Sequence, residues 1–349
     1  MPRNRVVEQD GTAAPDQVIL ARGLRKRFKA RGKTVEAVRG IDFAVQEGEI
    51  LGLLGPNGAG KTTTLRMLTT LLPIDGGSAR VAGFEVQRHP ARVRERIGYV
   101  SQLGGADELA TGRENLMLQG RLYGRPKAEV AGNVEEVLEV LDIAGIADRR
   151  AKTYSGGQRR RLDLALGIVH RPHVLFLDEP STGLDPQNRA HLWDHVRKLR
   201  QRGTTIFLTT HYLEEADSLC DRVMIVDHGL VVAEGTPKDL KRQVSGDSVL
   251  IVLKDADQTA PRALAAVRSL RFVKDASGQD DHVHLYVDDG ATALPELMRH
   301  LDAEGIGVGS ISLSEPSLDD VFLARTGRSL RDAEPLAGKS PAEKKEVAA

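Results

Sequence analysis

The segment Gly55–Thr62 reads Gly-Pro-Asn-Gly-Ala-Gly-Lys-Thr and matches the phosphate-binding pattern G-x-x-x-x-G-K-[ST] at every fixed position. Glycines let successive backbone N–H groups turn toward phosphate oxygens, and a helix that begins at Lys61 presents its positive end to the same anion. We expect Lys61 to reach the β- and γ-phosphates of a nucleotide and Thr62 to ligate Mg²⁺. The predicted nucleotide-binding residues of this loop are Gly55, Asn57, Gly58, Gly60, Lys61, Thr62 and Thr63.

A purely structural strand-to-helix turn is the alternative interpretation of this loop. A solvent-facing lysine supported by three glycines has no packing purpose, so the alternative is disfavoured. The pattern therefore predicts nucleoside triphosphate binding, without saying which reaction follows.

Two carboxylates, Asp178 and Glu179, end the apolar run that begins at Val174. A strand beside the phosphate loop would deliver both acids at its carboxyl end, where α/β sheets bind ligands. We expect Asp178 to hold the Mg²⁺, directly or through water, and Glu179 to polarise the attacking water as a general base. An exposed pair of loop carboxylates is the alternative, and it fits a preceding buried strand poorly.

These residues need a parallel sheet to position them. Ile50–Leu54 is nearly all apolar, as expected for a strand buried on both faces, and Lys61–Leu72 is typical of a helix. Further strands and helices are predicted to alternate along the chain, which implies an α/β fold. The strands are expected at 18–21, 41–45, 174–178, 204–210 and 222–226, and the helices at 159–169, 186–202 and 212–219. Residues 112–150 instead carry two helical patterns, 114–123 and 127–141, and are predicted to form a helical insert.

The pattern changes near residue 245. From there to 327 the order is β-α-β-β-α-β, which indicates a small α+β domain of the ferredoxin-like kind, followed by a short helix over 318–325. The predicted domains are thus 18–245 and 246–327, with disordered ends at 1–17 and 328–349. His282 and His284 alternate on one predicted strand, but no Cys or third ligand accompanies them, so solvent-facing histidines are favoured over a metal site.

Composition narrows the class of protein. Lys plus Arg equals Asp plus Glu at 49 each, which argues against a nucleic-acid partner, since such proteins usually carry a basic excess. A single cysteine, Cys220, excludes an intramolecular disulfide framework and is expected to be a buried, inert thiol. No apolar run approaches the ~20 residues that span a bilayer, and the N-terminus lacks a signal-peptide core, so a membrane function would need a partner.

The run Ser155-Gly156-Gly157-Gln158 precedes a predicted helix and lies beyond the helical insert. Over residues 18–245 this order of motifs resembles the ATP-binding cassette (ABC) ATPases, and the run is similar to their signature motif. The resemblance implies a fold with a P-loop NTPase core, the helical insert and an antiparallel β subdomain. It also implies that Ser155, Gly156, Gly157 and Gln158 contact the γ-phosphate of ATP bound to the opposite subunit.

Other positions follow from the same resemblance. Gln102 matches the Gln loop, which would sense Mg²⁺ and water and couple to a membrane partner. Asp185, in Ser181–Asp185, resembles the D-loop, which contacts the other subunit, and His211 matches the switch histidine at the γ-phosphate. Phe28 is the expected adenine-stacking aromatic, with a core aromatic as the alternative.

Two residues depart from the usual family pattern. Tyr154 stands before the signature in place of Leu, and Phe28 replaces the usual Tyr. Neither change removes a group needed for phosphate chemistry.

The resemblance implies an ATP-Mg²⁺-dependent ATPase that pairs with a second copy of itself and drives a separate permease from the cytoplasmic face of the membrane. Residues 160–166 with His170-Arg171-Pro172, and the ending 318–323, resemble daunorubicin-resistance drug exporters.

One alternative is a soluble ABC ATPase acting on DNA or ribosomes, but such relatives typically carry a long coiled coil or two cassettes. Another is a module that holds ATP without turnover, which the presence of Glu179 and His211 argues against. The smaller domain is hypothesised to support dimer contacts or regulation.

Overall fold

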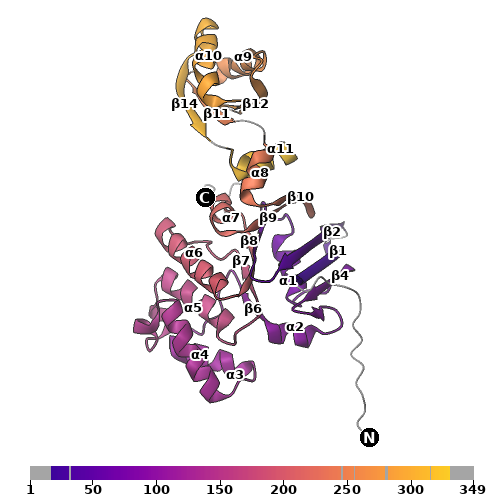
Figure 1. Cartoon of the computed structure of the whole chain (residues 1–349), viewed down its shortest axis with the longest axis vertical. Coiled ribbons are helices and arrows are strands. Elements are labelled where there is room, and N and C mark those ends of the chain that lie inside the picture. Colours follow the sequence, from indigo (N-terminus) through magenta and orange to yellow (C-terminus); the bar gives the residue numbers. More distant parts are fainter. Residues whose placement is uncertain are drawn as a thin grey trace, which may run out of the picture. The chain divides into compact units, whose positions relative to one another are not determined.

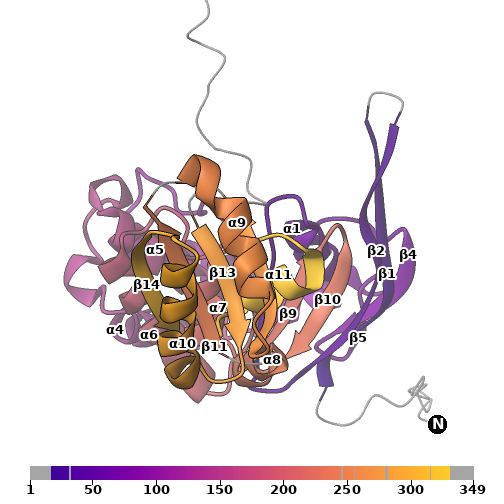
Figure 2. The ribbon, with the colours of Figure 1, turned by 90° about the horizontal axis from the view of Figure 1, so that it is seen from above.

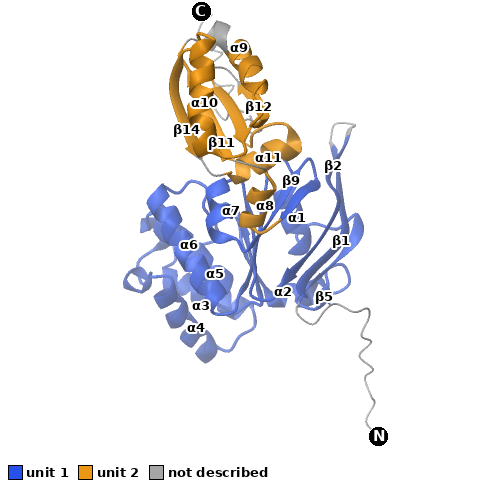
Figure 3. Cartoon of the chain, turned by 45° about the horizontal axis from the view of Figure 1, so that its top comes forward, with its two compact units in different colours: residues 1–234 blue, residues 235–349 orange. Residues whose placement is uncertain are grey.

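The computed structural model describes residues 17–30, 33–244, 247–254, 256–279, 282–314 and 316–330. The chain divides into two compact units, residues 1–234 and 235–349, which are described separately (Figure 3). The ends predicted to be disordered lie outside the described residues, except for Gln17 and residues 328–330.

The first unit contains a six-stranded sheet in the order β10-β9-β3-β8-β7-β6 (Figure 1). Five neighbouring strands are parallel: β3 (Ile50–Leu54), β6 (Ile97–Val100), β7 (Val174–Asp178), β8 (Thr205–Thr210) and β9 (Arg222–Asp227). The edge strand β10 is Leu230–Gly235. β3, β7 and β8 are buried along their whole length, which explains the apolar runs 50–54, 174–177 and 206–208 and confirms the predicted parallel sheet. β6 and β10 are not predicted from the sequence, since β6 has four residues and β10 is half exposed.

A second sheet of the same unit is antiparallel, in the order β2-β1-β4-β5. Its strands are β1 (Gln17–Ala30), β2 (Lys33–Gln46), β4 (Gly76–Val81) and β5 (Phe84–Glu85). β1 and β2 are far longer than the predicted runs, because their pairing continues to Ala30 and Lys33. Figure 2 shows this hairpin extending away from the rest of the unit.

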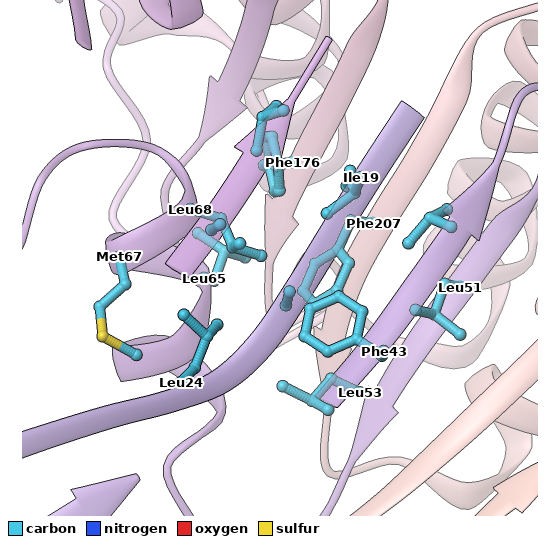
Figure 4. Packing of buried hydrophobic residues seen from close by; sticks show 14 of the residues in the cluster. Ile19, Leu24, Phe43, Leu51, Leu53, Leu65, Met67, Leu68, Phe176 and Phe207 are labelled. Atoms are coloured by element: carbon cyan, nitrogen blue, oxygen red, sulfur yellow. The ribbon is translucent and has the colours of Figure 1, made fainter. Parts of the chain in front are cut away.

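The helix α1 (Lys61–Leu68) lies between the two sheets. Figure 4 shows the shared core, in which Phe43 of β2 packs on Phe207 of β8 with ring centroids 5.7 Å apart. Residues of α1 that are buried in this core are Leu65, Met67 and Leu68. Burial of each such side chain stabilises the folded state by roughly 1.5–3 kcal/mol. This packing holds the start of α1 beside β3. The helix ends four residues earlier than predicted, where Thr70 adopts a left-handed conformation (φ 65°).

The remaining helices of this unit pack against the parallel sheet or against one another. They are α2 (Pro90–Arg96), α3 (Gly112–Leu122), α4 (Lys127–Val140), α5 (Gly156–Ile168), α6 (Pro186–Gln201) and α7 (Leu213–Leu219), with short 3₁₀ turns at Ala144–Ile146 and Ala151–Thr153. α3 and α4 are the two expected helices of the insert, and Thr111 with Glu114 forms a capping box that starts α3.

The second unit has its own core of buried residues. Its elements are α8 (Pro237–Gln243), β11 (Asp247–Leu253), α9 (Ala256–Arg268), β12 (Val273–Gln279), β13 (His282–Val287), α10 (Gly290–Ala303), β14 (Val308–Ser314) and α11 (Leu318–Thr326). The antiparallel sheet order β12-β13-β11-β14 confirms the predicted ferredoxin-like arrangement.

Several smaller expectations are also resolved. Cys220 is buried as predicted. His282 is exposed, whereas the side chain of His284 is only 27% exposed and lies 3.1 Å from Ser248 Oγ, so the prediction of a solvent-facing pair is wrong for His284. Within the described ranges, no group of three His, Cys, Asp or Glu side chains is placed to hold a metal. None of the helices in the described part of the chain combines the length and the apolar character needed to cross a bilayer.

Candidate active site

The phosphate loop is shaped by glycines that have no room for a side chain. A Cβ atom on Gly55 would lie 2.2 Å from the carbonyl oxygen of Val226, and one on Gly60 would lie 2.4 Å from that of Ala37. Gly58 and Gly60 have φ angles of 83° and 104°, which favour glycine. The loop therefore turns tightly between β3 and α1, with Asn57 and Gly58 on its exposed side.

The Lys61 ammonium lies inside this turn and is 4% exposed. Its Nζ donates to the carbonyls of Gly55 (2.7 Å) and Pro56 (3.1 Å) and lies 3.4 Å from Glu179 Oε1. A buried, oriented positive charge beside inward-turned backbone is suited to a polyphosphate. The half-buried Thr63 follows two positions later on α1.

Hydroxyl and carboxylate oxygens meet where the carboxyl ends of β7 and β8 approach the start of α1. Thr62 Oγ1 donates to Asp178 Oδ1 (2.8 Å), and Thr209 Oγ1 donates to the same oxygen (2.7 Å). Such hard oxygen donors fit Mg²⁺, which typically takes one or two protein oxygens and completes its shell with phosphates and water. The oxygens of Thr62 and Asp178 thus fit the predicted metal, and their role as its ligands stays a prediction.

Glu179 occupies a strained backbone position with φ 48°. Its N–H donates to both the carbonyl and the hydroxyl oxygen of Thr209, at 3.1 Å each, and these bonds hold the conformation. The turn aims the carboxylate away from Asp178 and toward Lys61.

Three further side chains approach the second carboxylate oxygen, Glu179 Oε2. His211 Nδ1 lies 3.2 Å away, Thr182 Oγ1 3.3 Å and Gln102 Nε2 3.5 Å. Burial opposes the charged carboxylate, but the hydrogen bond from His211 and the charge of Lys61 outweigh it and hold the pKa of Glu179 below its usual value. A carboxylate kept ionised and surrounded by orienting donors can accept a proton from water.

The signature residues lie elsewhere in the same unit. Ser155 and Gln158 form a capping box at the start of α5, in which Gln158 N donates to Ser155 Oγ (3.3 Å) and Ser155 N to Gln158 Oε1 (3.0 Å). Ser155 and Gly156 are exposed, so the positive end of α5 faces solvent. Figures 1 and 2 both place α5 apart from α1, so one copy does not unite the two predicted phosphate contacts.

The predicted D-loop residue Asp185 starts α6. Its carboxylate accepts from the backbone N of Asn188 (2.9 Å) and from that residue's Nδ2 (2.5 Å), and these bonds lower its pKa. A Cβ on Gly157 would lie 2.2 Å from Asn188 Oδ1. The signature and the D-loop are therefore in close contact at the starts of α5 and α6.

Tyr154, the departure from the family pattern, packs into the helical insert. It is 9% exposed, and its hydroxyl donates to the carbonyl of Ile146 (2.7 Å). The substitution for Leu thus adds a hydrogen bond between the signature and the insert.

Phe28 lies on the extended part of β1, where it pairs with Val35 of β2. It is 38% exposed, with Lys26 Nζ 5.6 Å from the ring centroid, so the alternative of a core aromatic is wrong. Ala37, two residues beyond Val35, lies against Gly60. An exposed ring on the strand pair beside the phosphate loop is available for an adenine, and its stacking role stays a prediction.

Sequence reasoning missed Thr209, Arg160 and Asp163. Thr209 is the register partner of Asp178, and a hydroxyl residue at the end of a buried strand was the signal for it. Arg160 donates to the carbonyls of Ser101, Glu179 and Pro180, and Asp163 accepts from the backbone of Gly105. Both look like exposed helix charges in the sequence, and only the packing shows otherwise.

Comparison with known proteins agrees with this geometry. The ABC transporter family model matches residues 38–182. The daunorubicin resistance ATP-binding protein DrrA2 of Streptomyces coeruleorubidus is 45% identical over 317 residues, which cover 90% of this chain and 97% of that protein. The chain belongs to the ABC transporter ATP-binding proteins. It hydrolyses ATP, coupled to transport, as this family does.

Other ABC proteins extend the likeness. The C-terminal domain of DrrA1-3-like ATP-binding proteins matches residues 235–326. The linearmycin resistance ATP-binding protein LnrL of Bacillus subtilis is 37% identical, over 87% of this chain and 97% of that one. A solved ATP-binding subunit of an ABC transporter is 26% identical, with a TM-score of 0.58 over 65% of this chain and 92% of that one.

Proposed function

We propose that this ABC ATPase powers the export of a drug or lipid-like compound through a separate permease, bound peripherally at the cytoplasmic face of the membrane. The observation that carries the proposal is the meeting of Lys61, His211 and Gln102 at the carboxylate of Glu179. The direction and cargo class rest on the related daunorubicin and linearmycin resistance proteins. These relatives do not favour the alternative of a soluble ATPase acting on DNA or ribosomes.

The residues divide the chemistry of ATP hydrolysis among them. Lys61 and the N–H groups of the phosphate loop stabilise charge on the β- and γ-phosphates. Thr62, Asp178 and Gln102 would hold Mg²⁺, which would supply further charge neutralisation when bound. Glu179 accepts the proton of the attacking water, and His211 orients Glu179 and contacts the γ-phosphate.

A second copy completes each site. The exposed positive end of α5 carries Ser155 and Gly156, and α5 lies apart from α1 of the same copy (Figure 1). Two copies related by a two-fold axis place each α5 end on the γ-phosphate held by the other phosphate loop. ATP then lies between the subunits, with Asp185 at the same interface, and hydrolysis releases them.

Exposed leucines support a permease contact. Leu103, next to Gln102, is 97% exposed, and Leu109 is 69% exposed. Leu118 and Leu122 of α3 are four residues apart, so they share a helix face, and they are 59% and 72% exposed. A permease segment that covers them gains roughly 1.5–3 kcal/mol for each leucine removed from water.

The variant Glu179→Gln tests the ATP sandwich. Without a general base the variant should bind ATP-Mg²⁺ but turn it over at least about 100-fold more slowly, in the range of a lost acid–base group. Light scattering coupled to gel filtration should then report a dimer with ATP and a monomer without it. Normal hydrolysis would remove Glu179 from the base role. A variant that stays monomeric in saturating ATP, alone and beside its permease, would exclude the sandwich.

The variant Leu103→Asp tests the permease contact. A charge at this exposed position leaves the fold intact but penalises a buried interface by several kcal/mol. We expect the ATPase rate of the isolated chain to stay within about twofold of wild type, while co-purification with the permease is lost. Leu230→Asp, at another partly exposed leucine, is the matched control and should retain the permease. Equal retention by both variants would place the contact elsewhere.

A further inference from the structure

The Gln loop, residues 101–105, is a tight turn fixed at both ends. Within the turn, Ser101 Oγ donates to the carbonyl of Gly104 (2.9 Å), and Gly104 N donates to the carbonyl of Ser101 (3.3 Å). The rest of its attachment comes from two charged side chains one helical turn apart on α5, Arg160 and Asp163.

The Arg160 guanidinium holds the start of the loop. It is 8% exposed, and its Nη1 donates to the carbonyl of Ser101 (2.8 Å), directly before Gln102. Its Nε and Nη2 donate to the carbonyls of Pro180 (2.5 Å) and Glu179 (3.4 Å). One buried planar group thus holds the backbone next to Gln102 and the backbone at Glu179, the two residues whose side chains approach each other.

Asp163 holds the end of the loop. It is 6% exposed, and its Oδ1 accepts from Gly105 N (2.9 Å). Gly104 has a φ of 79°, and a Cβ there would lie 2.7 Å from Asp163 Oδ2. The backbone of the loop therefore packs directly against this carboxylate. Burial lowers the pKa of Arg160 and raises that of Asp163, and the attraction between the two charges offsets part of both effects.

Arg160 therefore links the start of α5 to the loops that carry Gln102 and Glu179, and these two regions contact different ATP molecules in the dimer. In the ATP sandwich of the proposed function, on which this inference rests, the start of α5 touches the ATP held by the other copy. Gln102 and Glu179 serve the ATP held by their own copy. A rigid helix with a fixed guanidinium transmits a displacement at one of these sites to the other.

We propose that Arg160, supported by Asp163, is a positioning residue that couples the two ATP sites of the dimer by setting the spacing between Gln102 and Glu179. The three N–H donors of one guanidinium reach carbonyls on two separate loops. A lysine ammonium keeps the charge but is a compact point on a flexible stem, so it cannot hold all three in the same geometry.

The test compares Arg160→Lys with Arg161→Lys, in the full-length chain with ATP-Mg²⁺. Arg161 is the adjacent residue and also donates to backbone carbonyls, those of Leu141 and Asp142, but not to the Gln loop. For Arg160→Lys we expect kcat to fall by about tenfold or more and KM to change by less than about threefold. The Hill coefficient for ATP should fall from above 1 in wild type toward 1. Arg161→Lys should keep all three values within about twofold.

A second measurement separates positioning from folding and from the dimer itself. Glu179→Gln with Arg160→Lys should still bind ATP and dimerise, which shows that the variant is folded. Wild-type kcat and Hill coefficient in Arg160→Lys would overturn the inference, and so would a loss of ATP binding or of the folded dimer in the double variant. Failure of Glu179→Gln alone to dimerise would instead overturn the proposed function.

Discussion

At the scale of single residues, the adjacent acids Asp178 and Glu179 contact different side chains because the backbone turns between them. Asp178 ends β7 and accepts hydrogen bonds from Thr62 and Thr209. Glu179 is left-handed, a conformation that costs on the order of 1–3 kcal/mol, and its two N–H bonds to Thr209 offset that cost. The turn leaves the Asp178 carboxylate bonded to Thr62 and places the Glu179 carboxylate beside Lys61.

The stability of the fold should depend on pH through the ionised carboxylate of Glu179. The pKa of Glu179 is depressed despite burial, because His211 and Lys61 favour the ionised form. A depressed pKa means that the charged group stabilises the fold above its unfolded pKa of about 4.3, and that this stabilisation is lost as the pH falls through the lower folded value. We expect nucleotide-free wild type to be more stable than Glu179→Gln at pH 7, and the two to converge below about pH 4.

Urea unfolding of both proteins between pH 3 and pH 8 measures this difference. The variant Glu139→Gln, at another exposed carboxylate of the same unit, is the control, and its difference from wild type should change little with pH. A gap between wild type and Glu179→Gln that widens toward acid would contradict the assignment.

At the scale of elements, the start of α5 uses two adjacent glycines for different reasons. Gly157 has no space for a Cβ because Asn188, which bonds Asp185, lies against it. A Cβ on Gly156 would meet no other atom within 4 Å, and Gly156 is exposed. Packing within one copy explains Gly157, whereas access to a phosphate is the reason we propose for Gly156.

The variants Gly157→Ala and Gly156→Ala should therefore fail in different ways. Gly157→Ala must displace Asn188 and release Asp185, so the free energy of unfolding should fall by about 1–3 kcal/mol. Gly156→Ala should change it by less than about 0.5 kcal/mol, as for other unhindered surface changes, yet weaken the ATP-dependent dimer of Glu179→Gln. Chemical denaturation and gel filtration measure the two effects. The same loss of stability in both variants would refute the distinction.

At the scale of the whole molecule, two separate hydrophobic cores stabilise the two compact units. The proposed nucleotide-binding residues described above lie within residues 1–234, and their contacts join α1, β7 and β8. A ligand that binds one folded unit stabilises that unit by mass action.

Calorimetry should accordingly resolve two unfolding transitions. Saturating ATP-Mg²⁺ on Glu179→Gln should raise the Tm of the transition of residues 1–234, by several degrees at ligand concentrations about 100-fold above Kd, and leave the other unchanged. Val249→Ala, which truncates the core of residues 235–349, should lower only the other Tm. A single transition that shifts as one in both experiments would show that the units unfold together.

The sequence by itself determined the parts that depend on neighbouring residues. The phosphate loop, the Asp178-Glu179 pair and the Ser155–Gln158 run before a helix are short segments whose backbone chemistry is local. Apolar runs likewise predicted β3 and β7, because a strand buried on both faces presents few polar side chains. The β-α-β-β-α-β order of residues 247–314 followed from hydrophobic periodicity in the same way.

Only the tertiary structure decided which distant groups meet. Arg159, Arg160 and Arg161 are consecutive and look equivalent in sequence, yet Arg159 pairs with Glu108 and Arg161 contacts the end of α4. Arg160 alone of the three is buried beneath the Gln loop. A charged side chain is exposed or buried according to the segments packed against its helix, and here those segments lie about 20 and 59 residues away. No local pattern encodes that packing, so the coupling that we assign to Arg160 became visible only in the folded chain.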